Sequence, residues 1–186
     1  MLEIRFHGRG GQGTVLAAKM LADAVLRSGW GECMAIPEFG VERRGAPVLA
    51  YARISKETIR VRARVYAPDA VVVLDPVLAA SPAVLAGLKP GGIVIVNSEK
   101  TPSAGRRWRW LAIPAKAIAR SHGLGPRTAP MVNTAMCGAL VAALEVACLP
   151  SLEAAVRDAV PAKPEENVAA AREAYSLARR RLHAAA

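Results

Sequence analysis

Two short, uninterrupted runs of apolar residues limit the possible folds of this chain more than any other feature. The runs are residues 70–74 (Ala-Val-Val-Val-Leu) and 93–96 (Ile-Val-Ile-Val). Strands that are covered on both faces have this composition, and such coverage is typical of parallel sheets. Residues 81–88 between them are predicted as a helix, so this part of the chain indicates a strand–helix–strand unit of an α/β protein.

The first residues of the chain predict a strand, a glycine loop and a helix in succession. Apolar and polar side chains alternate over residues 2–7, and residues 15–26 have apolar positions at helical spacing. A loop in this setting brings backbone N–H groups and the positive end of a helix to a phosphate. The candidate binding loop consists of Gly8, Arg9, Gly10, Gly11, Gln12 and Gly13.

Three interpretations of this loop remain open: NAD binding, contact with another phosphate or nucleotide, and a purely structural turn. The NAD-binding version has a carboxylate about 20 residues further on, at the end of the second strand. Here the second predicted strand, residues 32–36, ends at Pro37, with Glu38 beyond it. Asp75 and Asn97 follow the two apolar runs, where such residues either face a ligand crevice or cap the next helix.

An antiparallel hairpin is predicted from residues 48–54 and 58–66. Side chains alternate along a strand, so the arginines of the second strand would share one face. These arginines are Arg60, Arg62 and Arg64. A second basic cluster, residues 106–110, contains two tryptophans. Arginine and tryptophan are enriched at protein interfaces, but a charged face also protects an exposed edge strand from pairing.

The remaining chain is predicted to be mostly helical. A further strand at 107–113 and a short helix ending near residue 123 precede helices over about 132–149, 151–159 and 165–182. The predicted fold class is therefore α/β: a Rossmann-like doubly wound sheet, mostly parallel with an antiparallel hairpin, with helices on both faces. No repeat or linker divides the chain, so a single domain is expected over residues 1–186.

No catalytic or metal site is predicted within this chain alone. Its three histidines are scattered in the sequence, and they form no recognisable triad or set of metal ligands. Cys33, Cys137 and Cys148 lie far apart without a C-x-x-C pair. This spacing favours three small buried hydrophobic residues over zinc or iron–sulfur ligands.

The net charge of +10, from 25 basic and 15 acidic residues, points to an anionic partner: nucleic acid, a phosphate-rich ligand or an acidic protein. Aromatic residues are only 4% of the chain, which argues against a base-stacking surface for nucleic acid. The weakly charged stretch 130–150 is predicted as a core helix, not a membrane span, because it contains Asn133, Thr134 and Glu145. We therefore expect a cytoplasmic protein that binds neither nucleic acid nor membrane.

Several segments together resemble the gamma subunits of the pyruvate (2-oxoacid):ferredoxin oxidoreductases. Two motifs carry the resemblance: His7-Gly-Arg-Gly-Gly-Gln-Gly-Thr14 and Pro37-Glu-Phe-Gly-Val-Glu-Arg-Arg-Gly-Ala-Pro47. Shorter matching segments are residues 50–54, 68–75, 91–97, 133–139 and 166–167. The similarity extends over nearly the whole chain. The second motif looks closer to the pyruvate and branched-chain 2-oxoacid enzymes than to the 2-oxoglutarate enzymes.

The resemblance implies a subunit of a complex that converts a 2-oxoacid and coenzyme A into acyl-CoA and carbon dioxide and passes electrons to ferredoxin. Thiamine diphosphate, magnesium and iron–sulfur clusters would belong to the alpha, beta and delta partner subunits. This chain alone would bind no cofactor and would not be catalytic, and its glycine loop would neighbour coenzyme A or an interface. The expected interface residues are Glu38, Phe39, Glu42, Arg43, Arg44, Arg60, Arg62 and Arg64. The alternative is a free-standing NAD- or nucleotide-binding oxidoreductase that uses the Gly8–Gly13 loop.

Overall fold

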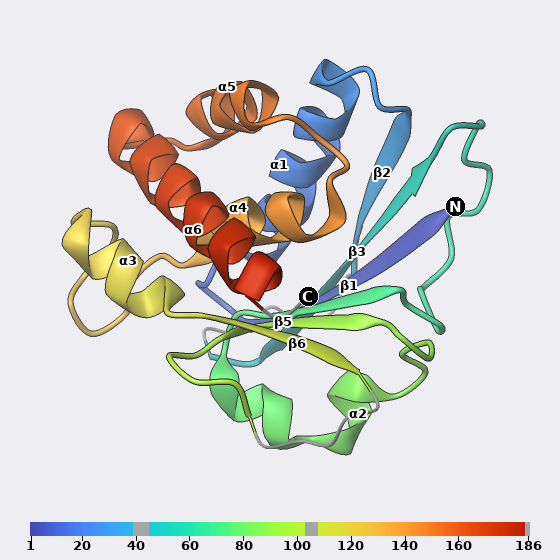
Figure 1. Cartoon of the computed structure of the whole chain (residues 1–186), viewed down its shortest axis with the longest axis horizontal. Helices are drawn as coiled ribbons and strands as arrows, with labels where there is room; N and C mark the ends of the chain where they lie inside the picture. Colours follow the sequence, from blue (N-terminus) through green and yellow to red (C-terminus); the bar gives the residue numbers. More distant parts are fainter. Residues whose placement is uncertain (39–44, 103–107, 185–186) are drawn as a thin grey trace.

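A computed structural model describes residues 1–38, 45–102 and 108–184 (Figure 1). The strands are β1 (Leu2–Arg9), β2 (Glu32–Pro37), β3 (Pro47–Ser55), β4 (Ala70–Val73), β5 (Ile93–Asn97) and β6 (Arg109–Ile113). The α-helices are α1 (Thr14–Arg27), α2 (Pro82–Leu85), α3 (Ala115–Ser121), α4 (Asn133–Leu144), α5 (Leu149–Ala159) and α6 (Pro164–Ala184). A 3-10 helix, η1 (Pro76–Ala80), precedes α2.

The described strands form one mixed sheet in the order β2-β3-β1-β4-β5-β6. The pairs β1–β4, β4–β5 and β5–β6 are parallel, whereas β3 runs antiparallel to both of its neighbours, β1 and β2. The predicted α/β class and the mostly parallel sheet with an antiparallel pair are confirmed. The hairpin, however, is formed by β2 and β3, and the strand after β3 in the prediction is absent from the sheet.

Residues 58–66, predicted as that strand, have no regular secondary structure. The buried guanidinium group of Arg53 on β3 donates hydrogen bonds to the carbonyl oxygens of Val61, Ala63 and Arg64, at 3.3, 2.5 and 3.0 Å. A buried carbonyl group needs one hydrogen-bond donor, whether backbone or side chain. Arg53 supplies three carbonyl groups of this segment with the donors that a neighbouring strand would otherwise provide, and the segment does not pair as a strand.

The helix predicted at 81–88 is replaced by two short ones: η1 begins earlier, at Pro76, and α2 ends earlier, at Leu85. Asp75 accepts a hydrogen bond from the Val77 amide and begins η1, and α2 is a single turn from Pro82. Pro82 has no amide hydrogen to continue a preceding helix, and Gly87 adopts a positive φ of 76° that ends the turn. The connection between β4 and β5 is therefore two short helical turns.

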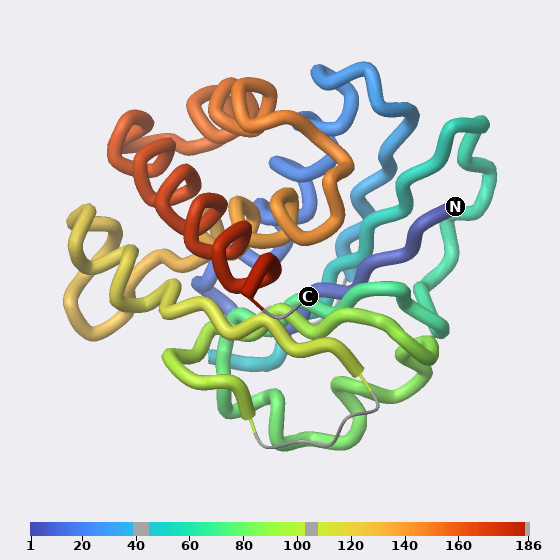
Figure 2. The backbone as a smooth tube through the Cα atoms, viewed as in Figure 1, coloured from blue at the N-terminus to red at the C-terminus, as the bar shows by residue number. Residues whose placement is uncertain are grey.

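The two faces of the sheet are covered unequally (Figure 1, Figure 2). Helices α1, α3, α4, α5 and α6 lie on one face, and η1 with α2 lies on the other. On β4, the side chain of Val72 packs into the larger core, whereas those of Val71 and Val73 pack into the smaller one. This alternation explains why the β4 and β5 runs are apolar throughout, as expected for strands buried on both faces.

Helix α4 lies at the centre of the helical layer, and ten of its twelve residues are buried. The prediction of a core helix here is confirmed. In the described part of the chain, no helix is both long and apolar enough to cross a bilayer. The Cα atom of Gly138 on α4 faces the carbonyl group of Ala171 on α6 so closely that a Cβ atom would overlap the oxygen. Glycine therefore determines how near α4 and α6 approach.

We expect Gly138→Ala to destabilise the protein, although helix propensity alone would favour alanine by about 1 kcal/mol. The added methyl group overlaps backbone atoms of Ala171, and overpacking of this kind costs about 1–3 kcal/mol. Chemical denaturation of the two proteins measures the difference. An unchanged or higher free energy of unfolding for Gly138→Ala would contradict the steric role of this glycine.

Candidate functional site

The glycine loop lies at the carboxyl edge of the sheet, between β1 and α1. Gln12 closes the turn, because its side chain accepts a hydrogen bond from the Arg9 amide at 2.8 Å and its own amide donates to the Arg9 carbonyl at 3.0 Å. Gly13 has a positive φ of 73° directly before α1, a conformation that favours glycine. A Cβ atom on Gly13 would lie 2.6 Å from Nδ2 of Asn133 on α4.

The loop is joined to the segment before β3 through Gly10. The Gly10 amide donates to the Ala46 carbonyl at 2.9 Å, and the Gly10 carbonyl accepts from the Gly45 amide at 3.2 Å. Sequence reasoning assigns Gly10 to close approach of a ligand. In the structure both of its backbone groups are already occupied, so a ligand would have to use the remaining amides of the loop.

An ion pair between Arg9 and Asp75 connects the ends of β1 and β4. The Arg9 guanidinium also donates to the Gly45 carbonyl at 3.1 Å, and the second oxygen of Asp75 accepts from the Val77 amide at 3.1 Å. Asp75 is therefore a helix cap and an ion-pair partner, one of the two roles left open by the sequence. Arg9 holds three segments of this edge together.

Asn97, at the end of β5, also has a structural role. Its side-chain amide donates to the Leu74 carbonyl at 2.9 Å, and its oxygen accepts from the Lys116 amide in the first turn of α3 at 3.1 Å. Asn97 is 7% exposed. Both ends of its side chain are occupied, so Asn97 caps α3 and is not available to a ligand.

A groove of about 700 Å³ borders the glycine loop, lined by Arg9, Gly10, Gly11, Gly13, Thr14, Val15, Leu16, Lys19, Val48 and Met131. The first turn of α1 carries no acidic residue and no side-chain cap, so its amide groups are available to an anion. Two buried oxygens near the loop, Thr14 Oγ1 and Asn133 Oδ1, have no hydrogen-bond partner within the described residues, and Thr14 also lines the groove.

Two contributors to this groove have no motif in the sequence. Lys19 lies on α1 beyond the loop, and Met131 lies before α4. Lys19 could have been identified from the sequence only by its place on the exposed side of α1, because helical periodicity puts Lys19 outside the core. Met131 reaches the groove through the packing of α4 against α1, which no local pattern specifies.

Glu38, at the end of β2, is engaged from two sides. It accepts a hydrogen bond from the Tyr51 hydroxyl, and its other oxygen lies 2.7 Å from a guanidinium nitrogen of Arg64. Burial and the hydrogen bond to Glu38 raise the pKa of Tyr51 to about 12. Because both carboxylate oxygens have partners, Glu38 is not free to hold ribose hydroxyls as NAD binding would require.

The structure describes only some of the predicted interface residues. Arg60, Arg62 and Arg64 are exposed, but on an irregular segment instead of a strand face. Arg60 and Arg62 form no ion pair with residues that the structure describes. The remaining predicted interface residues, Phe39, Glu42, Arg43 and Arg44, lie outside the described residues, as do Arg106 and Arg107 of the second basic cluster.

The three cysteines were predicted to be buried hydrophobic residues, and they differ in burial. Cys137 is fully buried and Cys33 is half-buried, and burial raises the pKa of both thiols to about 12. Cys148 is exposed, contrary to the prediction, because it lies immediately before α5. Hydrogen bonding between Cys148 and Ser151 lowers the pKa of Cys148. No three potential metal ligands gather within ranges 1–38, 45–102 and 108–184.

The histidines do not form a common site in the described structure. His122 pairs with Glu173 at 2.7 Å, and His183 lies in the last turn of α6. His7 is 8% exposed, and its Nε2 atom accepts a hydrogen bond from Nε of Arg5 at 3.0 Å. Burial, followed by the charge of Arg5, lowers the pKa of His7 to about 4. A neutral, hydrogen-bonded imidazole at this position is part of the fold and not a general base.

Comparison with known proteins gives one consistent result. A family model described as pyruvate ferredoxin/flavodoxin oxidoreductase matches residues 3–177. The chain is 45% identical over 181 residues to the pyruvate/ketoisovalerate oxidoreductases common subunit gamma of Pyrococcus abyssi, covering 94% of this chain and 96% of the relative. It is 43% identical over 177 residues to the pyruvate synthase subunit PorC of Methanocaldococcus jannaschii, with 95% and 96% covered.

A solved structure agrees with these relatives. The crystal structure of pyruvate oxidoreductase subunit PORC from Thermotoga maritima matches with a TM-score of 0.79 and 35% sequence identity. The match covers 94% of this chain and 95% of the other. The similarity therefore includes the sheet, the helical layer and the carboxyl edge described above.

We expect the stability of the protein to fall between pH 6.5 and about 4 because of His7. The folded state keeps His7 neutral down to about pH 4, whereas in the unfolded chain it takes up a proton near its ordinary value of 6.5. The unfolded state then binds more protons in this window, so acid favours unfolding, by roughly 3 kcal/mol for the full shift.

Urea denaturation across this pH range, in the native protein and in His7→Gln, measures the contribution. Glutamine keeps an acceptor for Arg5 but does not titrate. The native protein should lose more stability than the variant between pH 6.5 and 4. Parallel curves for the two proteins would show that His7 does not carry this dependence.

Proposed function

This chain belongs to the pyruvate ferredoxin/flavodoxin oxidoreductase family, and on that basis we propose that it acts as the gamma subunit of a pyruvate or related 2-oxoacid:ferredoxin oxidoreductase. The complex oxidatively decarboxylates a 2-oxoacid, transfers the acyl group to coenzyme A and passes the electrons to ferredoxin. The observation that carries the proposal is the 45% identity to a named gamma subunit over 96% of that subunit's length.

The isolated chain is a non-catalytic part of this oxidoreductase. Among the described residues, His7 accepts a buried hydrogen bond from Arg5, His122 pairs with Glu173, and Asp75 caps η1 and pairs with Arg9. Thiamine diphosphate, magnesium and iron–sulfur clusters are assigned to partner subunits, since the three cysteines of this chain differ widely in exposure and belong to separate elements. Its place of action is the cytoplasm.

The partner subunits are the alpha, beta and delta subunits of the complex, and ferredoxin is reached through them. The side chains that support this assignment are the exposed Arg60, Arg62 and Arg64, together with Glu38. Exposed arginines on one short segment suit the docking of an acidic protein surface. The loop with Phe39, Glu42, Arg43 and Arg44 continues directly from Glu38 in the sequence, and we assign it to the same interface.

The glycine loop is assigned to the phosphate groups of coenzyme A. The residues present fit an anionic ligand: the amides in the first turn of α1 have no side-chain cap, Arg9 and Lys19 supply positive charge at the groove, and the Thr14 hydroxyl, which has no partner among the described residues, can donate a hydrogen bond. Coenzyme A would supply the acyl-accepting thiol, and the residues of this chain would only bind and orient it. The alternative of a free-standing NAD enzyme is not supported by Glu38, the described carboxylate that follows β2, because it is bound by Tyr51 and Arg64.

The first test of the proposed function is copurification. A tagged chain expressed in the cell that encodes it should be recovered with partner subunits that contain thiamine diphosphate, and the chain alone should not decarboxylate any 2-oxoacid. The measurement is mass spectrometry of the purified complex together with 2-oxoacid-dependent reduction of ferredoxin. Recovery of the tagged chain free of any thiamine-dependent partner would contradict a gamma-subunit role.

The coenzyme A assignment is tested in the assembled complex with Lys19→Gln. Loss of one charge-assisted contact to a phosphate should raise the KM for coenzyme A about three- to tenfold, with little change in kcat. Arg180→Gln, which removes a cation from the exposed end of α6, should leave this KM unchanged. An unchanged KM for Lys19→Gln, or tight calorimetric binding of NAD by the lone chain, would overturn the assignment.

A further inference from the structure

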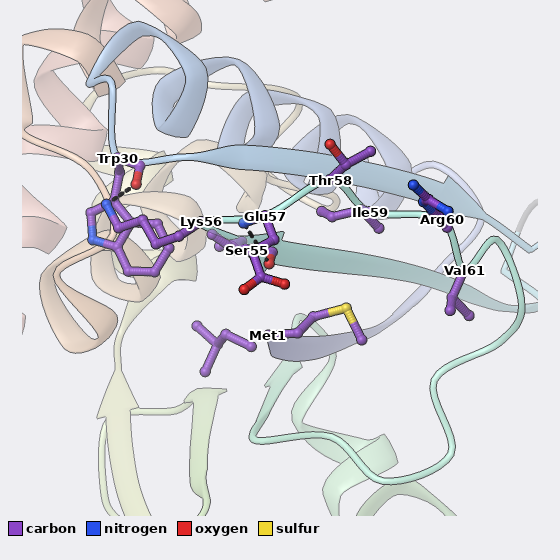
Figure 3. A pocket seen from close by; sticks show the side chains of 11 residues that line it. Met1, Trp30, Ser55, Lys56, Glu57, Thr58, Ile59, Arg60 and Val61 are labelled. Atoms are coloured by element: carbon purple, nitrogen blue, oxygen red, sulfur yellow. Dashed lines mark hydrogen bonds between the residues drawn. The ribbon is translucent and has the colours of Figure 1, made fainter.

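A second groove, of about 1010 Å³, lies at the amino edge of the sheet, opposite the glycine loop (Figure 3). Met1 and Leu2 at the start of β1, Trp30 before β2 and residues 54–61 after β3 line it. We call it the Trp30 groove. The glycine loop assigned to coenzyme A lies at the other edge, so this groove is independent of that assignment, and among its lining residues Arg60 is a predicted interface residue.

Apolar side chains are exposed in the Trp30 groove. Met1 is 61% exposed and Val61 is 48% exposed, and the side chains of both are directed to the open part of the groove (Figure 3). Leu2, next to Met1, and Trp30, at the other end of the groove, are only partly buried (Figure 3). Adjacent exposed apolar side chains rimmed by charged residues are typical of protein interaction sites.

The rim of the groove is cationic. The Lys56 ammonium group lies 4.1 Å from the centroid of the Trp30 ring and donates to the Trp30 carbonyl, which holds it at the rim. Arg60 is exposed on the same segment, followed by exposed Arg62. Glu57 is the one carboxylate among the described residues that line the groove. The segment therefore presents an excess of positive charge beside its apolar side chains.

The segment that carries this charge is held in place from beneath. The Ile59 amide donates to the Glu32 carboxylate at 2.9 Å, and the Glu57 amide donates to the Ser55 hydroxyl at 3.1 Å. Further along, Arg53 binds the three carbonyl groups described above. A surface that is ordered before binding loses less conformational entropy when a partner docks.

We propose that the Trp30 groove seats an extended acidic segment of another subunit of the oxidoreductase. A large apolar side chain of that segment packs between Met1 and Val61, and its carboxylates pair with Lys56 and Arg60. This inference rests on the proposed function, because the segment belongs to a partner within that complex. A second copy of this chain fits poorly, since each copy carries a net charge of +10 and would bring like charges together.

The experiment measures assembly of the full chain with its co-expressed partner subunits. Hydrogen exchange of residues 54–61 should slow at least fivefold in the complex relative to the free chain. Arg60→Glu should weaken assembly at least tenfold by dissociation constant. Arg180→Glu reverses an equally exposed charge on α6 and should change the constant less than twofold. Lys56→Glu is a second test, with thermal unfolding to verify that each variant folds.

Each outcome separates this inference from the function on which it rests. If the native chain joins the complex but residues 54–61 are not protected, or if Arg60→Glu assembles as tightly as the native chain, the groove has no docking role while the gamma-subunit role stands. Protection of these residues in the chain alone, with self-association, would make a second copy the occupant and overturn the proposal. Failure of the native chain to bind any partner subunit would overturn both.

Discussion

Two buried guanidinium groups hold the face of the sheet that the helical layer leaves uncovered. Arg5 on β1 donates to the carbonyl groups of Val84 and Ala86, at 2.9 and 2.7 Å, and so fixes the connection after α2. Arg53 on β3, which is 2% exposed and paired with Glu3, holds the segment after β3. Both connections are hydrogen-bonded to the sheet through these two side chains.

The sheet has a groove at each of its two edges, and an arginine side chain holds neighbouring segments in place at each edge. At the carboxyl edge, Arg9 and Asp75 join β1, β4 and the segment before β3 around the glycine loop. At the amino edge, the segment fixed by Arg53 leads from the Trp30 groove. Grooves at both edges and a buried, neutral His7 fit the proposed role as a subunit that contacts other subunits.

Much of this fold could be predicted because its signals are local. The apolar runs of β4 and β5, the glycine loop and the periodic helices α1 and α6 each occupy one short stretch of sequence. The predicted strand at 58–66 failed for the opposite reason. Its period-two alternation is real for buried Ile59 and Val65, but its carbonyl groups are taken by Arg53, a partner outside the stretch that no periodicity reports.

The sequence by itself determined the fold class, the place of the glycine loop and, through its motifs, the family, since these depend on short-range patterns of side chains. Only the tertiary structure decided that Glu38 and Asp75 are occupied by Tyr51, Arg64 and Arg9, that His7 is buried against Arg5, and that a groove opens beside Trp30. Hydrogen bonds and burial are properties of atoms brought together from distant positions, and those positions meet only when the sheet forms.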